Sequence, residues 1–273
     1  MPLIDEHLPT LGDRWRRHEL AAGRLEPAAG SLRFALAGAT AGRYSNAQID
    51  DYSNKTGRRH FPWRPPLRLT VRARFSHPAG QLQGTAGFGF WNDPFLMTGI
   101  RLPALPQAVW YFYASPPANL KLDLRVPGHG WKAAAIDAAR PAAWLLAPLA
   151  PPAVLLMQAR PLYRALWPRF QRALHIREAL LPISMTDWHT YTIDWGLHRS
   201  HFSVDGRRVG PVFPSPRGPL GLVLWLDNQT MVVTPQGRFR WGLLPVQDRQ
   251  WLEVQRLSVE PTASRPAAAG EAE

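Results

Sequence analysis

The sequence contains no cysteine at all. This absence excludes disulfide bonds, thiolate metal sites and cysteine nucleophiles, and with them any secreted module that depends on disulfides for its stability. The N-terminal segment also lacks the uninterrupted apolar core of about 7–15 residues that a secretion signal requires. We therefore expect an intracellular, cytoplasmic protein.

Acidic residues are scarce relative to basic ones. Lys and Arg number 32 against 20 Asp and Glu, which gives a formal net charge of +12. Such an excess attracts anionic surfaces, whether nucleic acid or lipid headgroups. The excess is almost entirely arginine, and a general preference for Arg, Ala and Pro explains it equally well. Since no basic and aromatic motif of a nucleic-acid-binding fold is present, we do not expect nucleic acid as a partner.

The composition favours an all-β protein. Of 273 residues, 45% are hydrophobic, and 12 Trp, 11 Phe and 6 Tyr supply material for a large core. The 21 Gly and 28 Pro suit many turns rather than long helices. A chain of this length can fold as a single β-sandwich.

The stretch 188–213 has the clearest strand pattern. His189, Tyr191, Ile193 and Trp195 alternate with polar residues, as one face of a strand requires. A second strand begins near residue 201, and Asp205-Gly206 is a dipeptide suited to a two-residue hairpin turn. We expect a meander of antiparallel strands here.

This stretch resembles the W-H-x-Y-x-I-x-W…F-x-V-D-G-x-x-V signature of the family 16 glycoside hydrolases. The matching residues are Trp188, His189, Tyr191, Ile193, Trp195, Phe202, Val204, Asp205, Gly206 and Val209. The resemblance implies a concanavalin A-like antiparallel β-sandwich, or jelly roll. The motif is structural in that family, so it bears on the fold rather than on the chemistry.

We expect the sandwich to span residues 31–260. A loosely ordered leader, 1–30, precedes it with one short helix around 11–20, and a disordered tail, 261–273, follows it. The other predicted strands are 31–36, 67–76, 84–90, 107–115, 119–126, 219–227 and 250–259. The intervening segments 44–52 and 228–236 are predicted to be turns or loops.

A calcium loop is one alternative for the segment 44–52, because it is rich in oxygen-bearing side chains. The alternating spacing of such a loop is missing there. We therefore expect no metal and no other cofactor.

Residues 137–182 are predicted to form a partly helical insertion. The lead, 141–159, has no charged residue, but Pro141, Pro148, Pro151 and Pro152 divide it into pieces too short to cross a bilayer. The part 161–181 has the pattern of a basic amphipathic helix. Three interpretations remain open: attachment to the inner surface of a membrane, a lid over an apolar ligand, and packing against the sandwich.

The resembled family implies a catalytic pair of carboxylates in an E-x-D-x-E strand, and this sequence has no such run. Retaining glycosidases need two carboxyl groups about 5–5.5 Å apart. No Glu occurs between Glu26 and Glu178, where the order of the resembled strands requires the pair. Matching 87–94 to the preceding strand places aromatic residues of 109–115 where the acids would stand. We therefore expect that hydrolysis has been lost.

Aromatic side chains stack on sugar rings and equally on apolar ligands, so the sequence predicts a binding cleft in place of the acids. The candidate ligand-binding residues are Trp91, Asn92, Trp110, Tyr111, Phe112, Tyr113, Trp225, Asn228 and Trp241. The first hypothesis is a non-hydrolytic sandwich that binds a carbohydrate or glycolipid-like ligand at a membrane surface. The second is an enzyme acting on an apolar or sugar-linked substrate through Asp93, His129 or Asp227. The third is a structural interaction module.

Overall fold

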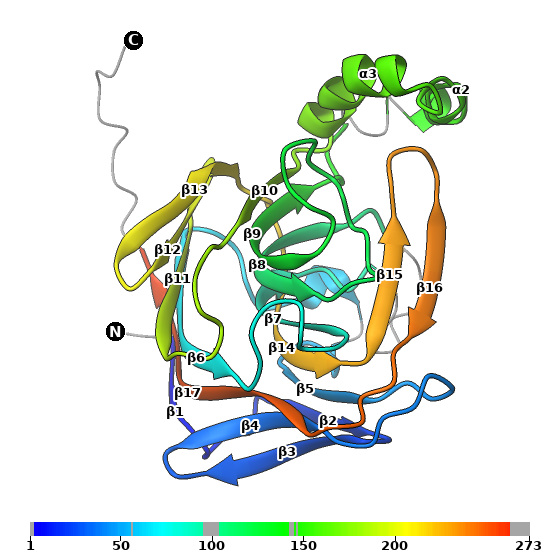
Figure 1. The fold of residues 1–273 in the computed structure, drawn as a ribbon. Coiled ribbons are helices and arrows are strands. Elements are labelled where there is room, and N and C mark those ends of the chain that lie inside the picture. Colours follow the sequence, from blue (N-terminus) through cyan, green and yellow to red (C-terminus); the bar gives the residue numbers. More distant parts are fainter. Residues whose placement is uncertain (1–2, 56, 95–103, 142–144, 146, 263–273) are drawn as a thin grey trace.

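The protein is a sandwich of two antiparallel sheets (Figure 1). The computed structural model describes residues 3–55, 57–94, 104–141, 145 and 147–262. Sheet A has the strand order β13-β12-β11-β6-β17-β4-β3, with β1 paired to β17, and sheet B has the order β10-β9-β8-β7-β14-β5-β2. This architecture confirms the predicted antiparallel jelly roll.

The strands of sheet A are β1 (Ile4–His7), β3 (Gly23–Ala28), β4 (Ser31–Leu36), β6 (Leu67–Phe75), β11 (His189–Trp195), β12 (Arg199–Val204), β13 (Arg207–Pro214) and β17 (Gln250–Pro261). Those of sheet B are β2 (Arg16–Leu20), β5 (Asn46–Asp50), β7 (Thr85–Trp91), β8 (Gln107–Ala114), β9 (Gly130–Asp137), β10 (Arg177–Leu180) and β14 (Gly221–Asp227). A separate ribbon is formed by β15 (Gln229–Val233) and β16 (Phe239–Leu243).

The main core lies between the two sheets and is rich in aromatic rings. Phe88, Tyr111, Trp131 and Tyr191 are buried, with ring centroids 5.0 to 5.8 Å apart. Each of these residues comes from a different strand: β7, β8 and β9 are neighbours in sheet B, and β11 belongs to sheet A. The rings therefore join both sheets into one packed layer.

The predicted meander is present. β11 pairs with β12, and β12 pairs with β13, while the predicted face of β11 is buried against sheet B from Tyr191 to Trp195. Asp205 and Gly206 have φ of 49° and 76°, as a two-residue turn with positive φ at both positions requires. The Asp205 Oδ2 lies 2.6 Å from His189 Nδ1, and its Oδ1 accepts the backbone N–H of Thr190. The motif histidine thus fixes the hairpin.

The prediction of a loosely ordered leader is wrong for residues 3–30, the part of this segment that the structure describes. Residues 16–20, expected to lie in a short helix, form the edge strand β2 of sheet B, while β1 and β3 belong to sheet A. The segment 3–30 therefore contributes to both sheets. Its many charged residues concealed the pattern, because edge strands keep much of their surface in water.

Three further predictions are corrected. The segment 119–126 is a loop rather than a strand, and the strand that pairs with β8 is β9. The segment 44–52 contains the fully buried strand β5. The expected loop 228–236 contains β15. For β5 and β15, pairing with neighbouring strands decides the conformation, and local composition does not show those neighbours.

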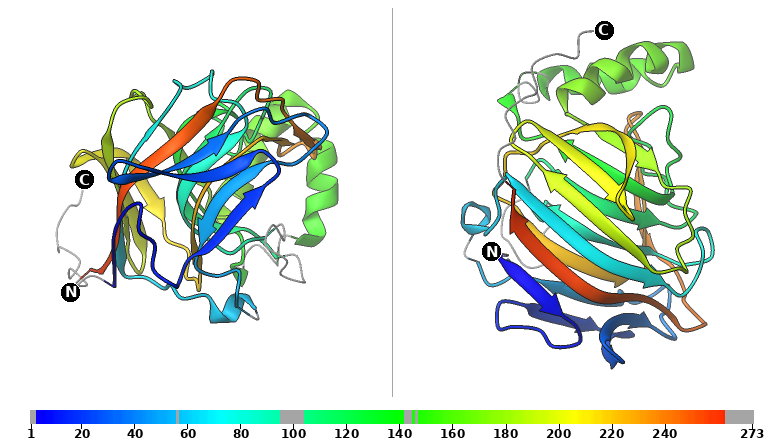
Figure 2. Two further views of the ribbon diagram at one scale, coloured as in Figure 1. Left: turned by 90° about the horizontal axis from the view of Figure 1, so that it is seen from below. Right: turned by 90° about the vertical axis from the view of Figure 1, so that its left-hand side faces the viewer.

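The insertion contains the 3-10 turn η2 (Ala147–Leu149), the helices α2 (Ala150–Leu156) and α3 (Arg160–Ala173), and then β10. Another 3-10 turn, η1 (Arg58–His60), lies outside it. The helix predicted for 161–181 ends earlier than expected, since 177–180 pairs with β9. Figures 1 and 2 show α2 and α3 at one end of the sandwich. No helix among the described residues has the length and apolar character that crossing a membrane requires.

One side of α3 packs on the loop after β8. Trp167 is buried with Ile176, Met157 and Ala153, and Leu122 and Leu124 pack against this group. Trp167 Nε1 donates a hydrogen bond of 2.8 Å to the carbonyl of Leu122. The insertion is therefore attached to the body of the protein through its own small core.

Candidate functional site: the outer face of sheet B

Four aromatic side chains form a continuous strip on the face of sheet B that is turned away from sheet A. They are Trp91 on β7, Trp110 and Phe112 on β8, and Trp225 on β14. The ring centroid of Trp110 lies 5.7 Å from that of Trp91, 5.3 Å from that of Phe112 and 5.4 Å from that of Trp225. Trp110 and Phe112 are partly exposed, whereas Trp91 and Trp225 are buried. We call these four residues the aromatic strip.

Two glycines of β7 make room for the strip. Gly87 and Gly89 occupy outward positions between β8 and β14. A Cβ on Gly87 would lie 2.8 Å from a ring carbon of Trp225, and one on Gly89 would lie 2.6 Å from the Trp110 Cα. The glycine-rich sequence of β7 is thus explained by the rings and backbone of neighbouring strands.

A buried polar network borders the strip on the side of β5. Gln48 lies beside Trp225 in the sheet, and its Nε2 donates to Asp50 Oδ2 at 2.9 Å. The same carboxylate oxygen is 2.8 Å from His18 Nε2, and Ser53 donates to it at 2.6 Å. Burial opposes ionisation of Asp50, but the hydrogen bonds from His18, Ser53 and Gln48 outweigh it and lower the pKa of this carboxyl.

Asp227 lies next to the strip at the end of β14. Its Oδ1 accepts hydrogen bonds from the Thr85 hydroxyl at 2.8 Å and the Gln229 backbone at 3.0 Å. Thr85 in turn accepts the Trp225 indole N–H at 3.0 Å. Burial raises the pKa of Asp227 to about 6. This carboxyl can therefore exchange a proton near neutral pH.

Tyr44 is hydrogen-bonded to Asp227. Its hydroxyl donates to Asp227 Oδ2 at 3.4 Å. Burial raises the pKa of Tyr44 well above its usual value, and the charges of Asp227 and Asp93 raise it further. Tyr44 therefore stays protonated over the whole pH range in which Asp227 titrates.

Lys132 closes the other side of the strip. It lies beside Phe112 in the sheet and is fully buried. Its Nζ is 3.2 Å from Glu178 Oε1, and the other carboxylate oxygen of Glu178 accepts the backbone N–H of Asp123. The loop after β8 thus covers the sheet at β9 and β10, and it limits the strip to β7, β8 and β14.

The structure brings together some of the predicted ligand-binding residues and separates others. Trp91, Trp110, Phe112 and Trp225 form the strip. Tyr111 and Tyr113 do not belong to a cleft: they are fully buried in the core between the sheets. Adjacent residues of a strand point to opposite faces, so only alternate aromatics of β8 can face outward. Trp241 lies on β16, half exposed, and its indole donates to Gln229.

Asn92 and Asn228 have structural roles in the loops that they join. The side chain of Asn92 bonds the backbone of Leu105 and Gln107. Asn228 is fully buried and bonds the backbone of four residues, namely Thr40, Arg43, Ser45 and Leu244. Their amides are therefore occupied by the protein itself.

The three weak catalytic candidates do not converge. Asp93 follows one end of β7, while Asp227 pairs with Thr85 at its other end. Asp93 is buried with φ of 44°, and its carbonyl accepts a hydrogen bond from Arg58. His129 is exposed in the loop before β9. The described residues contain no group of three His, Cys, Asp or Glu that could hold a metal.

His18 and Lys132 were missed by the sequence analysis, and Asn46, Gln48 and Asp50 were considered there only as part of a possible calcium loop. The signal for three of them was the alternation of polar and apolar residues in 46–50, which is a strand pattern. The outward positions of β8 are Ala108, Trp110, Phe112 and Ala114, which alternate with residues of the main core. None of these four side chains is a carboxylate.

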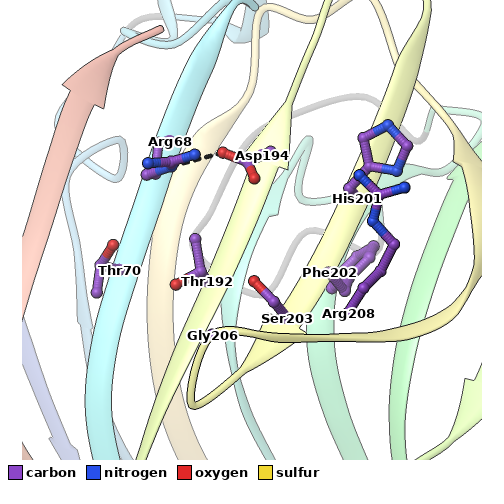
Figure 3. A pocket seen from close by; sticks show the side chains of 9 residues that line it. All are labelled: Arg68, Thr70, Thr192, Asp194, His201, Phe202, Ser203, Gly206 and Arg208. Carbon is purple, nitrogen blue, oxygen red and sulfur yellow. Dashed lines mark hydrogen bonds and ion pairs between the residues drawn. The ribbon is translucent and has the colours of Figure 1, made fainter.

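A second, polar hollow of about 350 Å³ lies on the outer face of sheet A (Figure 3). The hydroxyls of Thr70, Thr192 and Ser203 share one row across β6, β11 and β12. Arg68 points toward Asp194, with 2.6 Å between Nε and Oδ1 (Figure 3). This lining suits small polar or anionic molecules and differs in chemistry from the aromatic strip.

No protein-family model matches this sequence, and no curated protein matches it. Solved structures do resemble it. An endo-β-galactosidase from Clostridium perfringens that releases GlcNAcα1-4Gal has a TM-score of 0.54 and 14% identity, over 95% of this chain and 61% of that one. A non-specific endo-β-1,3(4)-glucanase of glycoside hydrolase family 16 has a TM-score of 0.51 and 13% identity, over 95% and 90% of the two chains.

A pseudo β-1,3-glucanase of Mycobacterium tuberculosis also resembles this protein, with a TM-score of 0.51 and 10% identity over 96% of this chain and 99% of that one. The protein therefore has the concanavalin A-like sandwich of the family 16 glucanases, as the motif in 188–209 predicted. At these identities the likeness concerns the fold.

Proposed function

We propose that this protein binds a carbohydrate at the aromatic strip and does not cleave it. The observation that carries the proposal is the strip itself, with two partly exposed rings, Trp110 and Phe112, stacked 5.3 Å apart on the outward face of a central strand. Sugar rings present apolar faces that stack on such side chains. Proteins with carbohydrate substrates in their names share the fold, which supports this class of ligand.

The polar border of the strip favours a sugar over a purely apolar ligand. The Oδ1 atom of Asn46 is buried and has no hydrogen-bond partner among the described residues. Asn46 lies beside Asp227, and its amide N–H donates to Gln48. A buried acceptor without a hydrogen-bond donor lowers the stability of the folded state, and a ligand hydroxyl or a water molecule would supply the missing donor.

The outward residues of β8 support the proposed absence of cleavage. Glycoside hydrolysis by the two-carboxylate route requires two acids flanking the scissile bond. Trp110 and Phe112 lie on β8, the strand that the resemblance in sequence matches to the one carrying the acids of family 16. Two stacked rings supply binding energy but cannot act as nucleophile or proton donor.

Titration calorimetry with oligosaccharides of β-1,3-glucan and β-1,3-1,4-glucan tests the proposal. Replacing Trp110 by Ala should weaken binding roughly tenfold, as expected for the loss of one stacked ring. Trp188→Ala is the matched control, because Trp188 is a partly exposed tryptophan that lies near Arg72 and Arg74 of sheet A. Equal losses in both variants, or no binding by the wild type, would contradict the proposal.

An enzyme on the same scaffold is the second candidate, and Asp227 favours it. Burial raises the pKa of this carboxyl to about 6, and the Tyr44 hydroxyl donates a hydrogen bond to it. Release of reducing ends from the same glucans, abolished by Asp227→Asn, would support this candidate and exclude simple binding. If neither binding nor cleavage of any glycan on an array is found, the third hypothesis, an interaction module, is favoured.

A further inference from the structure

The insertion carries a second apolar surface besides the one that it buries. The inner side of α3 is occupied, because Trp167, Phe170 and Leu174 pack with the loop after β8. Other leucines of the insertion point into solvent. Their exposed fractions are 80% for Leu145, 55% for Leu149, 73% for Leu155, 52% for Leu156 and 40% for Leu162. Packing against the sandwich therefore accounts for the buried apolar residues of the insertion but not for its exposed leucines.

The β15–β16 ribbon extends this apolar surface. Its strand β16 exposes Phe239 at 69% and Trp241 at 50%, with exposed Arg238 and Arg240 beside them. The turn of the ribbon contacts the segment between α2 and α3, since Gln158 Nε2 donates a 2.7 Å hydrogen bond to the carbonyl of Gln236. Figure 1 shows the ribbon reaching up to the helices.

The charge of this region has one sign. No Asp or Glu occurs between Asp137 and Glu178. The arginines of this stretch are Arg140, Arg160, Arg164, Arg169, Arg172 and Arg177. All but Arg140 are exposed. With Arg238 and Arg240, these exposed arginines lie in the same segments of the chain as the exposed leucines and the aromatic residues of β16.

We propose that the exposed apolar side chains of this region form a docking surface for an anionic lipid bilayer: Leu145, Leu149, Leu155, Leu156, Leu162, Phe239 and Trp241. Leucine and aromatic side chains gain free energy on entering the interface between headgroups and acyl chains, while arginines remain with the lipid phosphates. The helices lie in the plane of the interface, since α2 and α3 have 7 and 14 residues and are too short to cross.

Charge decides between a bilayer and a second copy of this chain. Two copies joined through this surface would bring both arginine sets together with no acidic residue from 138–177 to pair with them. An anionic bilayer supplies the missing negative charge and a layer for the leucines at once. This proposal is independent of carbohydrate binding, because it concerns a different face.

Flotation of the full-length protein with vesicles tests the docking surface. The protein should float with phosphatidylcholine vesicles that contain phosphatidylglycerol and stay behind with phosphatidylcholine alone. Raising the salt concentration should weaken binding, because the arginine contribution is screened. Binding that is equal for the two vesicle types, or absent from both, overturns the proposal.

Paired variants separate the leucines from a general effect of mutation. Leu155→Ser with Leu156→Ser should reduce vesicle binding roughly tenfold or more, given the free energy of burying two leucines. Arg160→Gln with Arg164→Gln should do so by roughly tenfold. The control for the first pair is Leu197→Ser, which changes a leucine of the sandwich that is 51% exposed. A loss as large in the control contradicts the proposal.

The absence of native cysteine allows a direct measurement of insertion. A single Leu156→Cys variant carrying an environment-sensitive fluorophore should shift to the blue with anionic vesicles, and a labelled Leu197→Cys variant should not. An unchanged spectrum at 156 in bound protein means that another surface docks. Concentration-dependent dimers in light scattering that the Leu155/Leu156 serine pair abolishes would assign the surface to self-association instead.

Discussion

The ring of Trp225 covers Gly87 so closely that a Cβ on this glycine would lie 2.8 Å from a ring carbon. The same Cβ would lie 2.3 Å from the carbonyl oxygen of Tyr111. We expect Gly87→Ala to destabilise the protein by about 1–3 kcal/mol, the usual cost of overpacking, and to displace Trp225 from the strip. Urea unfolding measures the first effect, and glucan affinity measures the second.

Gly42→Ala is the control for this change, because a Cβ there meets nothing within 4 Å. The control should leave the unfolding free energy within roughly 0.5 kcal/mol of wild type. A Gly87→Ala variant as stable as the control would show that the strip is loosely packed.

Asn228 provides a test of structural against ligand-binding roles. Its Oδ1 accepts the Ser45 N–H at 2.9 Å, and its Nδ2 donates to Leu244 at 3.0 Å and to two further carbonyls. Asn228→Ala leaves these buried groups without partners, so we expect a loss of roughly 3 kcal/mol in unfolding free energy. Glucan affinity of the folded variant should not change. Asn54→Ala is the control, because Asn54 is exposed. Reduced glucan affinity with normal stability in Asn228→Ala would show that Asn228 belongs to the binding site.

The meander at 188–213 could be predicted because its information is local. Alternation placed Tyr191, Ile193 and Trp195 on one face, and the Asp205-Gly206 dipeptide specified the turn. Strands defined by their neighbours could not be predicted in this way. β2 reads as polar, yet it pairs with β5 along its whole length. β15 was missed for the same reason.

The candidate site was predictable in its residue types but only partly in its geometry. The run 107–115 predicted an aromatic strand. Because side chains alternate between the two faces of a strand, either Trp110 and Phe112 or Tyr111 and Tyr113 could face outward. Only the packing of Tyr111 against Trp131 settles which pair is buried. Lys132 and Glu178 are 46 residues apart, and nothing local connects them.

Asp51 should make the stability of the protein depend on pH near neutrality. Burial raises the pKa of this carboxyl to about 7, although it accepts hydrogen bonds from the Trp63 indole at 2.5 Å and the Leu222 backbone at 2.9 Å. The folded state therefore holds a proton that the unfolded state releases above its pKa of about 3.9. Stability from this group is complete below the unfolded pKa and is lost as pH rises to 7.

The measurement is urea unfolding at several pH values. For the wild type we expect Asp51 to lower the free energy of unfolding by about 3 kcal/mol between pH 5 and pH 8. Each pH unit changes this free energy by about 1.4 kcal/mol over the range where Asp51 is protonated only in the folded state. Asp51→Asn should flatten the profile by this amount. Exposed Asp248→Asn serves as control. A profile that Asp51→Asn leaves unchanged would show that the carboxylate stays ionised when buried.

Lys132 and Glu178 form a buried ion pair that supports the closed side of the strip. The nitrogen and oxygen are 3.2 Å apart, and Glu178 is joined through Asp123 to Gln171 of α3. Burial lowers the pKa of Lys132 and raises that of Glu178, so each charge depends on the other. Lys132→Met alone leaves a buried carboxylate without its cation, and we expect it to lower the free energy of unfolding by about 3–5 kcal/mol.

Replacing both partners, Lys132→Met with Glu178→Leu, should recover much of this loss, because two apolar side chains of similar size remove both desolvation penalties. A double-mutant cycle from urea unfolding gives the coupling directly. The control pair is Arg68→Met with Asp194→Leu, a partly exposed ion pair of sheet A whose coupling we expect to be below about 1 kcal/mol. Equal coupling in the two cycles would mean that burial does not strengthen the dependence of Lys132 on Glu178.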